Sequence, residues 1–206
     1  MANIIIYSMI FIIGTLLGSF FTLAVHRIPL KQDITHERSY CPNCNHKLNF
    51  LDLIPVLSYL FLEGKCRYCK NKIRPRYLIL EILSGITFLL LALSLKIDIF
   101  NFNVETLGYL IFGMLYISTL IMIGGIDKEY NKITKSILIF GIIIEIMYIT
   151  YLYVLKVNIY RYIIYIALLI IAGTINNCKR RLELLNNTNF LIFILIGIVE
   201  IGLIII

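Results

Sequence analysis

Long apolar runs separated by short polar segments form the dominant pattern along this chain. A helix that crosses a bilayer needs about 20 apolar residues, with about 17 as the lower limit. Five runs meet this limit, and a sixth is shorter and would have to cross with little tilt or where the bilayer is thin. The pattern therefore predicts an all-α integral membrane protein with about six transmembrane helices. The expected spans lie near residues 4–25, 78–95, 105–126, 136–155 and 190–206, with the short one at about 160–175.

One polar loop, residues 26–77, interrupts this series after the first span. It holds fourteen of the thirty-one charged residues, all four prolines, all three histidines and four of the five cysteines. We therefore expect three parts: a first transmembrane helix at 1–25, the polar loop at 26–77, and a helical membrane domain at 78–206.

Composition agrees with this division. The chain is 60% hydrophobic and 15% charged, whereas soluble domains are roughly half apolar and about a quarter charged. This excludes a secreted disulfide scaffold, a disordered tail and a large water-soluble enzyme. The opening apolar run has no basic start and no small-residue cleavage site, so we expect no cleavable signal peptide.

Lysine and arginine set the expected orientation, because cytoplasmic loops carry an excess of both. With six spans, three loops share one side and hold ten, three and three basic residues, at 26–77, 127–135 and 176–189. The other side holds Lys96, Lys156 and Arg161. Both termini are therefore expected outside and the polar loop in the cytoplasm. The net charge of +7 then reflects topology and attraction to anionic membrane lipids, and we expect no nucleic-acid partner.

Two C-x-x-C motifs stand in the polar loop, with twenty-one residues between them. In a reducing cytosol such pairs indicate a metal site. Four thiolates complete the tetrahedral sulfur set that zinc prefers and leave no open position, so we expect a structural zinc ion. The alternatives are buried apolar cysteines or disulfides, or a site in which His46 replaces one cysteine. Cys178 has no such partner and is expected to be a small apolar residue. The predicted ligands are Cys41, Cys44, Cys66 and Cys69.

The loop and its flanks also resemble a known family. The segments Gly18–Pro29, Ile54–Leu60, Gly64–Cys69 and Ile73–Glu81 resemble the N-terminal part of the type IV prepilin peptidases, over about residues 14–90. Members are integral-membrane aspartic proteases that cut the short basic leader from prepilins and pseudopilins at the cytoplasmic membrane face. Many also methylate the new N-terminus with S-adenosylmethionine. The resemblance implies a bacterial cytoplasmic membrane protein with prepilin or pseudopilin substrates in pilus assembly or protein secretion, and S-adenosylmethionine as cofactor if methyl transfer is retained.

The resemblance implies a catalytic aspartate at Asp127. The segment from Ile126 to Thr134 matches the family pattern I-D-x-x-x-x-x-I-P except for threonine in place of proline. Asp127 is also the only aspartate at the cytoplasmic end of an expected span, and two glycines precede it. The alternative is an interfacial carboxylate paired with Lys128 or Lys132.

The family's second aspartate, in a G-x-G-D motif, has no match. Spacing places Asn189 at that position, without the glycines. An aspartic protease needs two carboxyls that share a proton, and an amide cannot act as the base. Losing an acid–base partner costs about 10²–10⁴ in rate. Glu183, in the same loop, is a candidate substitute, and its alternative is a solvated partner of Arg180 or Arg181.

The chain is therefore expected to be a prepilin leader peptidase-like protein with weak or lost activity. The alternative is a catalytically inactive paralogue that binds prepilin or a membrane partner through the zinc loop. A transporter is supported only by Glu145 and Glu200, which fall in mid-membrane. Glu81 is expected to have a structural or substrate-positioning role. The spacing of Gly14 and Gly18 predicts close helix packing within the bundle.

Overall fold

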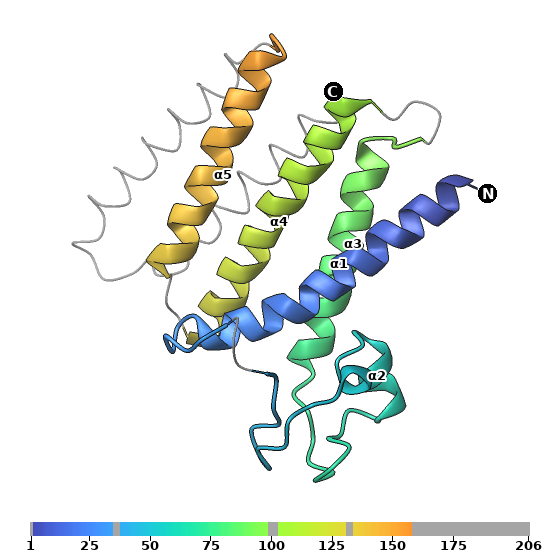
Figure 1. Cartoon of the computed structure of the whole chain (residues 1–206), viewed down its shortest axis with the longest axis vertical. Helices are drawn as coiled ribbons and strands as arrows, with labels where there is room; N and C mark the ends of the chain where they lie inside the picture. Colours follow the sequence, from blue (N-terminus) through green and yellow to red (C-terminus); the bar gives the residue numbers. More distant parts are fainter. Residues whose placement is uncertain (1, 35–37, 99–102, 131–133, 158–206) are drawn as a thin grey trace.

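The computed structural model describes residues 2–34, 38–98, 103–130 and 134–157, and these fold mainly into helices (Figure 1). Four helices are long and apolar enough to cross a membrane: α1 (Ala2–Arg27), α3 (Arg76–Ser94), α4 (Val104–Tyr130) and α5 (Lys135–Val154). Two short helices, η1 (Phe50–Asp52) and α2 (Leu57–Phe61), lie in the polar loop between α1 and α3. No strand longer than an isolated bridge occurs in the described ranges. The all-α prediction and its first four spans are confirmed.

The expected spans at 160–175 and 190–206 lie outside the described residues. So do Cys178, Glu183, Asn189 and Glu200. The count of six helices therefore stays a prediction.

Helix ends differ from the apolar runs by up to one turn. The run at 105–126 predicts an end before Asp127, but α4 continues to Tyr130. The run at 78–95 predicts a start at residue 78, but α3 begins at Arg76. Hydropathy marks where side chains become polar, whereas the backbone hydrogen bonds of a helix continue past that point. Asp127 therefore lies on a helix and not in the loop that follows it.

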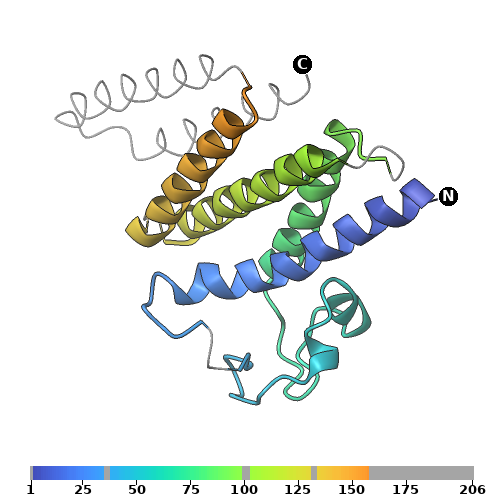
Figure 2. The same cartoon turned by 45° about the horizontal axis from the view of Figure 1, so that its top comes forward.

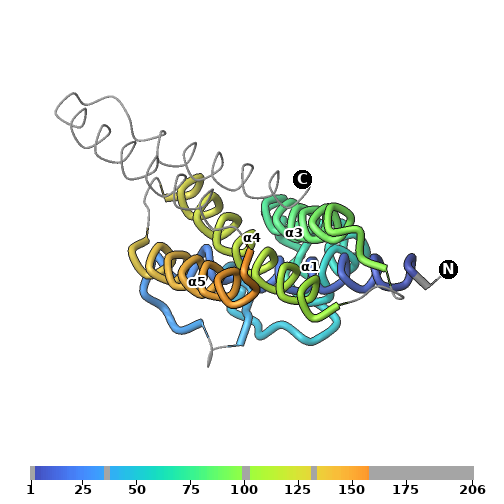
Figure 3. The backbone as a smooth tube through the Cα atoms, turned by 90° about the horizontal axis from the view of Figure 1, so that it is seen from above, coloured from blue at the N-terminus to red at the C-terminus, as the bar shows by residue number. Residues whose placement is uncertain are grey.

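Helices α1 and α3 cross at close range, as the three views of the bundle show (Figures 1, 2 and 3). A Cβ atom added at Gly14 would lie 2.8 Å from the Cα of Gly85, and one added at Gly18 would lie 2.8 Å from the Cα of Glu81. The two backbones are thus in contact, which is how small residues let helices associate in lipid. The packing role predicted for Gly14 and Gly18 is confirmed.

Helix α4 packs against both α1 and α3 through further small residues. Gly125 lies against the Val25 side chain of α1, and Gly113 lies against Leu91 of α3. Phe88 of α3 is fully buried in the core between these helices. Outward-facing positions carry large apolar side chains instead, among them Ile5 and Ile146, as expected of helices that face lipid.

We expect Gly18→Ala to destabilise the bundle by about 1–3 kcal/mol, because the added methyl group meets backbone that cannot move aside alone. The measurement is the temperature at which the purified protein in detergent loses its monodisperse size-exclusion peak.

Gly141→Ala is the matched control. Its Cβ would meet nothing closer than Thr119 at 3.9 Å, and alanine favours a helix over glycine. The control should match or exceed the wild type. Equal loss of stability in both variants would contradict the close α1–α3 contact.

Candidate metal centre and membrane-face site

Each C-x-x-C motif folds into a tight hairpin, or knuckle. In the first knuckle the Cys41 N–H donates to the His46 carbonyl at 3.0 Å and the Asn45 N–H donates to the Cys41 carbonyl at 2.8 Å. A bridge between Tyr40 and Lys47 closes it. Asn45 has a left-handed φ of 55°, a conformation that asparagine adopts more readily than most residues. This turn directs both cysteine side chains of the pair toward one point.

The second knuckle repeats the first. The Cys66 N–H donates to the Asn71 carbonyl at 2.8 Å, the Lys70 N–H donates to the Cys66 carbonyl at 3.0 Å, and Lys65 bridges Lys72. Lys70 has the left-handed φ of 58° at the position equivalent to Asn45. The same local geometry thus arises twice from the same spacing of cysteines.

The two knuckles bring their sulfurs together. All four Sγ atoms lie within 4.8 Å of one another, and those of Cys41 and Cys69 are 3.9 Å apart. Zinc–sulfur bonds of about 2.3 Å in a tetrahedron place sulfurs about 3.8 Å apart, so the cluster fits a zinc ion. The four cysteines of this cluster are free thiols, which speaks against the disulfide alternative. His46 is outside the cluster and stacks on Tyr68, with ring centroids 3.6 Å apart.

The sulfurs differ in their surroundings. Burial raises the pKa of Cys41, but the backbone N–H groups of Cys44 and Asn43 outweigh it and lower that pKa to about 7. At Cys69 the Asn71 N–H favours the thiolate, but desolvation and the other three sulfurs raise the pKa to about 11. Four crowded thiols therefore cannot all lose their protons together unless a cation compensates their charge.

An ion pair fastens η1 to the second knuckle. Asp52 accepts a hydrogen bond from Arg67 Nε at 2.6 Å and another from the Asn49 N–H at 3.1 Å. Burial raises the pKa of Asp52, but these two donors and Tyr68 hold it below its usual range. The segment between the knuckles is thus held to the cysteine cluster by hydrogen bonds to one carboxylate.

Glu81 ties the loop to the membrane helices. It is 8% exposed and accepts a hydrogen bond from the Val56 N–H at 2.7 Å, while Ser19 of α1 also hydrogen-bonds to it. Val56 has a left-handed φ of 62°, which is costly for a β-branched residue and is held in place by this bond. The structural role expected for Glu81 agrees with this position.

Arg27 orders the start of the loop. Its guanidinium, at the end of α1, donates to the carbonyls of Asp33 at 2.7 Å and Arg38 at 3.3 Å, and it lies over the Tyr40 ring, 5.8 Å from its centroid. An arginine that satisfies loop carbonyls has no signature in local sequence, so this role was not predicted.

Asp127 lies half-buried in the last turn of α4. Within the described residues its carboxylate makes no ion pair or side-chain hydrogen bond, so the pairing with Lys128 does not occur, and Lys132 lies outside those residues. Two residues further on, Glu129 contacts Arg76 directly and lies 3.5 Å from Arg74. Positions two apart on a helix point about 200° apart, so Asp127 faces away from the two arginines.

The site residues fall into two groups in space. The four cysteines meet at one point in the loop, and Asp127 lies at the end of α4, which is joined to the end of that loop by Glu129. The Glu129 contacts span more than fifty residues and were not predicted. Asn189 and Glu183 lie outside the described residues, so the second catalytic position stays a prediction.

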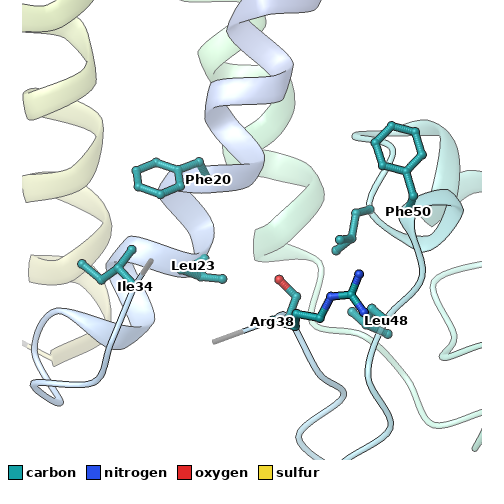
Figure 4. Close-up of a pocket in the computed structure, with 8 residues that line it drawn as sticks. Phe20, Leu23, Ile34, Arg38, Leu48 and Phe50 are labelled. Carbon is teal, nitrogen blue, oxygen red and sulfur yellow. The ribbon is translucent and has the colours of Figure 1, made fainter. Parts of the chain in front are cut away.

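A cavity of about 320 Å³ lies between α1 and the polar loop (Figure 4). Its walls are mainly apolar, and Arg38 and Ser39 supply the polar groups. The cavity is lined by Phe20, Leu23, Ile34, Arg38, Ser39, Leu48, Phe50 and Leu53.

Comparisons with known proteins agree with the resemblance. Residues 12–95 match the family described as the Bacterial Peptidase A24 N-terminal domain. A protein of Bacillus subtilis named "Prepilin leader peptidase/N-methyltransferase" is 36% identical over 133 residues, which are 65% of this chain and 50% of the relative. Relatives of the same name in Klebsiella pneumoniae and Myxococcus xanthus are 32% and 42% identical, over 59% and 38% of this chain.

The chain covers 52% of the Klebsiella protein and 24% of the Myxococcus protein. It therefore spans about half or less of the length of these relatives. No solved structure matches the chain. The matched segment contains both knuckles, Glu81 and the α1–α3 contact, and over it the chain is similar to the N-terminal domain of the type IV prepilin peptidase family.

Proposed function

We propose that this chain is a multi-pass protein of the bacterial cytoplasmic membrane that processes the leaders of type IV prepilins or pseudopilins at the cytoplasmic face. The observation that carries the proposal is the position of Asp127. It lies in the last turn of a membrane-length helix, and the Glu129 contacts with Arg74 and Arg76 join that helix end to the loop shared with the named peptidases.

The proposed chemistry is aspartyl proteolysis. One carboxyl would draw a proton from water while a second donates one to the scissile carbonyl. Asp127 would supply the carboxyl that draws the proton from water. The position of the proton-donating carboxyl would be occupied by Asn189, or Glu183 would take that role. Since an amide has no acid form near neutral pH, a site of Asp127 and Asn189 would be slow or inactive. In the latter case the chain would be a paralogue that binds prepilin or a membrane partner through its loop.

The loop is proposed to hold zinc on its four cysteines. A closed Cys₄ set leaves no position for substrate, so the ion would supply folding free energy and no catalytic chemistry. The relatives are also named N-methyltransferases. S-adenosylmethionine would be the methyl donor if that activity is retained, and its binding residues stay unassigned.

Purified protein should contain about one zinc ion per chain, because the four sulfurs match one tetrahedral site. Cys41→Ser or Cys69→Ser should release it and destabilise the loop, whereas Cys178→Ser should not. Acid should also release the ion, because protons compete for the thiolates. Metal analysis of each variant checks this, and metal-free wild-type protein with four freely reactive thiols would contradict it.

The polar loop should face the cytoplasm, because it carries most of the basic residues that flank the spans. Cysteines introduced at Lys47 and Lys132 should resist a membrane-impermeant thiol reagent in intact cells, and one introduced at Lys156 should react. Labelling at Lys47 would reverse the proposed orientation.

Prepilin cleavage should be slow or absent in the wild type, and any activity should disappear in Asp127→Asn. Asn189→Asp should raise the rate by about 10²–10⁴ if it restores the acid–base partner. The assay compares these variants and Glu183→Gln side by side in membranes. Cleavage that survives Asp127→Asn would rule out the aspartyl mechanism, and fast cleavage abolished by Glu183→Gln would give the second role to Glu183.

A further inference from the structure

The segment between the two knuckles exposes an apolar edge, formed by five side chains of η1 and α2. Phe50 and Phe61 are each 83% exposed, and Leu51, Leu57 and Leu60 are more than half exposed. The two short helices contact each other, so these exposed side chains lie close together in the loop. A loop surrounded by water rarely presents so many large apolar groups together.

The apolar edge is held level with the membrane helices. Val56, immediately before α2, is bonded to Glu81, which lies five residues, or about 7.5 Å, along α3 from its start at Arg76. Gly18 of α1 packs on Glu81 at the same level. The start of α2 therefore lies beside the second turn of α3 and the C-terminal half of α1. Along α3 this is within the depth of about 5–10 Å at which interfacial helices bury their apolar faces.

The cavity joins the apolar edge to the lipid-facing side of α1. Phe20 and Leu23 of α1 form one wall, and Phe50 and Leu53 of the loop form another. Figure 4 shows the Phe50 ring pointing in the direction in which the spanning helices leave the loop. Arg38 lies in the same cavity, and its planar guanidinium suits a phosphate group.

The charge of the loop fits a membrane partner. Residues 26–77 carry ten basic and four acidic residues, a net charge of 10 − 4 = +6. Basic segments next to a span are attracted to anionic lipid headgroups. The apolar edge suits the acyl-chain boundary of a bilayer, and the positive charge of the loop suits its anionic headgroups.

We propose that the apolar edge of η1 and α2 is an interfacial anchor that inserts into an anionic phospholipid leaflet, with Arg38 at the lipid phosphates. The anchor holds the cysteine loop against the bilayer, so that the loop is fixed to the membrane at α1, at α3 and along this edge. The proposal does not depend on peptidase activity.

The chain contains no tryptophan, so the fluorescence of one introduced tryptophan comes from that position alone. Phe61→Trp and Phe50→Trp are reconstituted as full-length protein in phosphatidylglycerol vesicles with brominated acyl chains. Lys47→Trp is the matched control, because Lys47 is exposed on the first knuckle, and the knuckles lie at the end of the loop away from the helices (Figure 1). Zinc content confirms that each variant keeps its loop.

The bromines should quench Phe61→Trp and Phe50→Trp by about twofold or more, because an interfacial apolar face reaches the acyl boundary. Lys47→Trp should stay unquenched.

Quenching of all three variants to the same small extent would overturn the anchor. Equal quenching in brominated phosphatidylcholine would overturn the role given to Arg38 and the loop charge. Shielding by a synthetic apolar prepilin segment, without quenching by lipid, would make the edge a protein-binding surface and overturn the proposal.

Discussion

The contact between the backbones of α1 and α3 is the constraint on which the rest of the structure depends. Gly18 allows α1 to touch α3 at Glu81, and this contact fixes the two ends of the 48 residues (28–75) that lie between these helices. Closing a loop of this length costs entropy, although the cost grows only slowly with length. Once α1 and α3 meet, the Glu81 carboxylate can accept the hydrogen bond from the Val56 N–H. The cysteine cluster then has to order only the parts of the loop before and after Val56.

Local patterns predicted the parts of the structure that depend on neighbouring residues. Four apolar runs became the four membrane-length helices, because a bilayer demands length and hydrophobicity from every span. The two cysteine pairs met at one point, because each pair carries its own turn geometry. The spacing of Gly14 and Gly18 indicated a packing face, but the partner residues on α3 became known only from the structure.

The parts that were not predicted depend on contacts between distant residues. Glu129 pairs with arginines more than fifty residues earlier, and nothing near Glu129 distinguishes it from a solvated carboxylate. The sequence likewise does not indicate that Val56 takes a left-handed conformation, because a β-branched residue rarely does so. The sequence motif placed Asp127 near the end of a helix. Hydropathy alone placed Asp127 in the following loop, because hydropathy measures the polarity of side chains and not the hydrogen bonds of the backbone.

The link from Glu129 to Arg74 and Arg76 makes the loop and the fourth helix interdependent parts. The arginines lie at the junction of the loop and α3, whereas the glutamate lies two residues from Asp127. A charged contact outside the bundle core therefore adds to the α1–α3 contact in holding the polar loop near the end of α4 that carries Asp127. A chimera that exchanges this loop for one from a relative would also have to exchange its matching charge at the end of α4, so the smallest transferable module is larger than the loop itself.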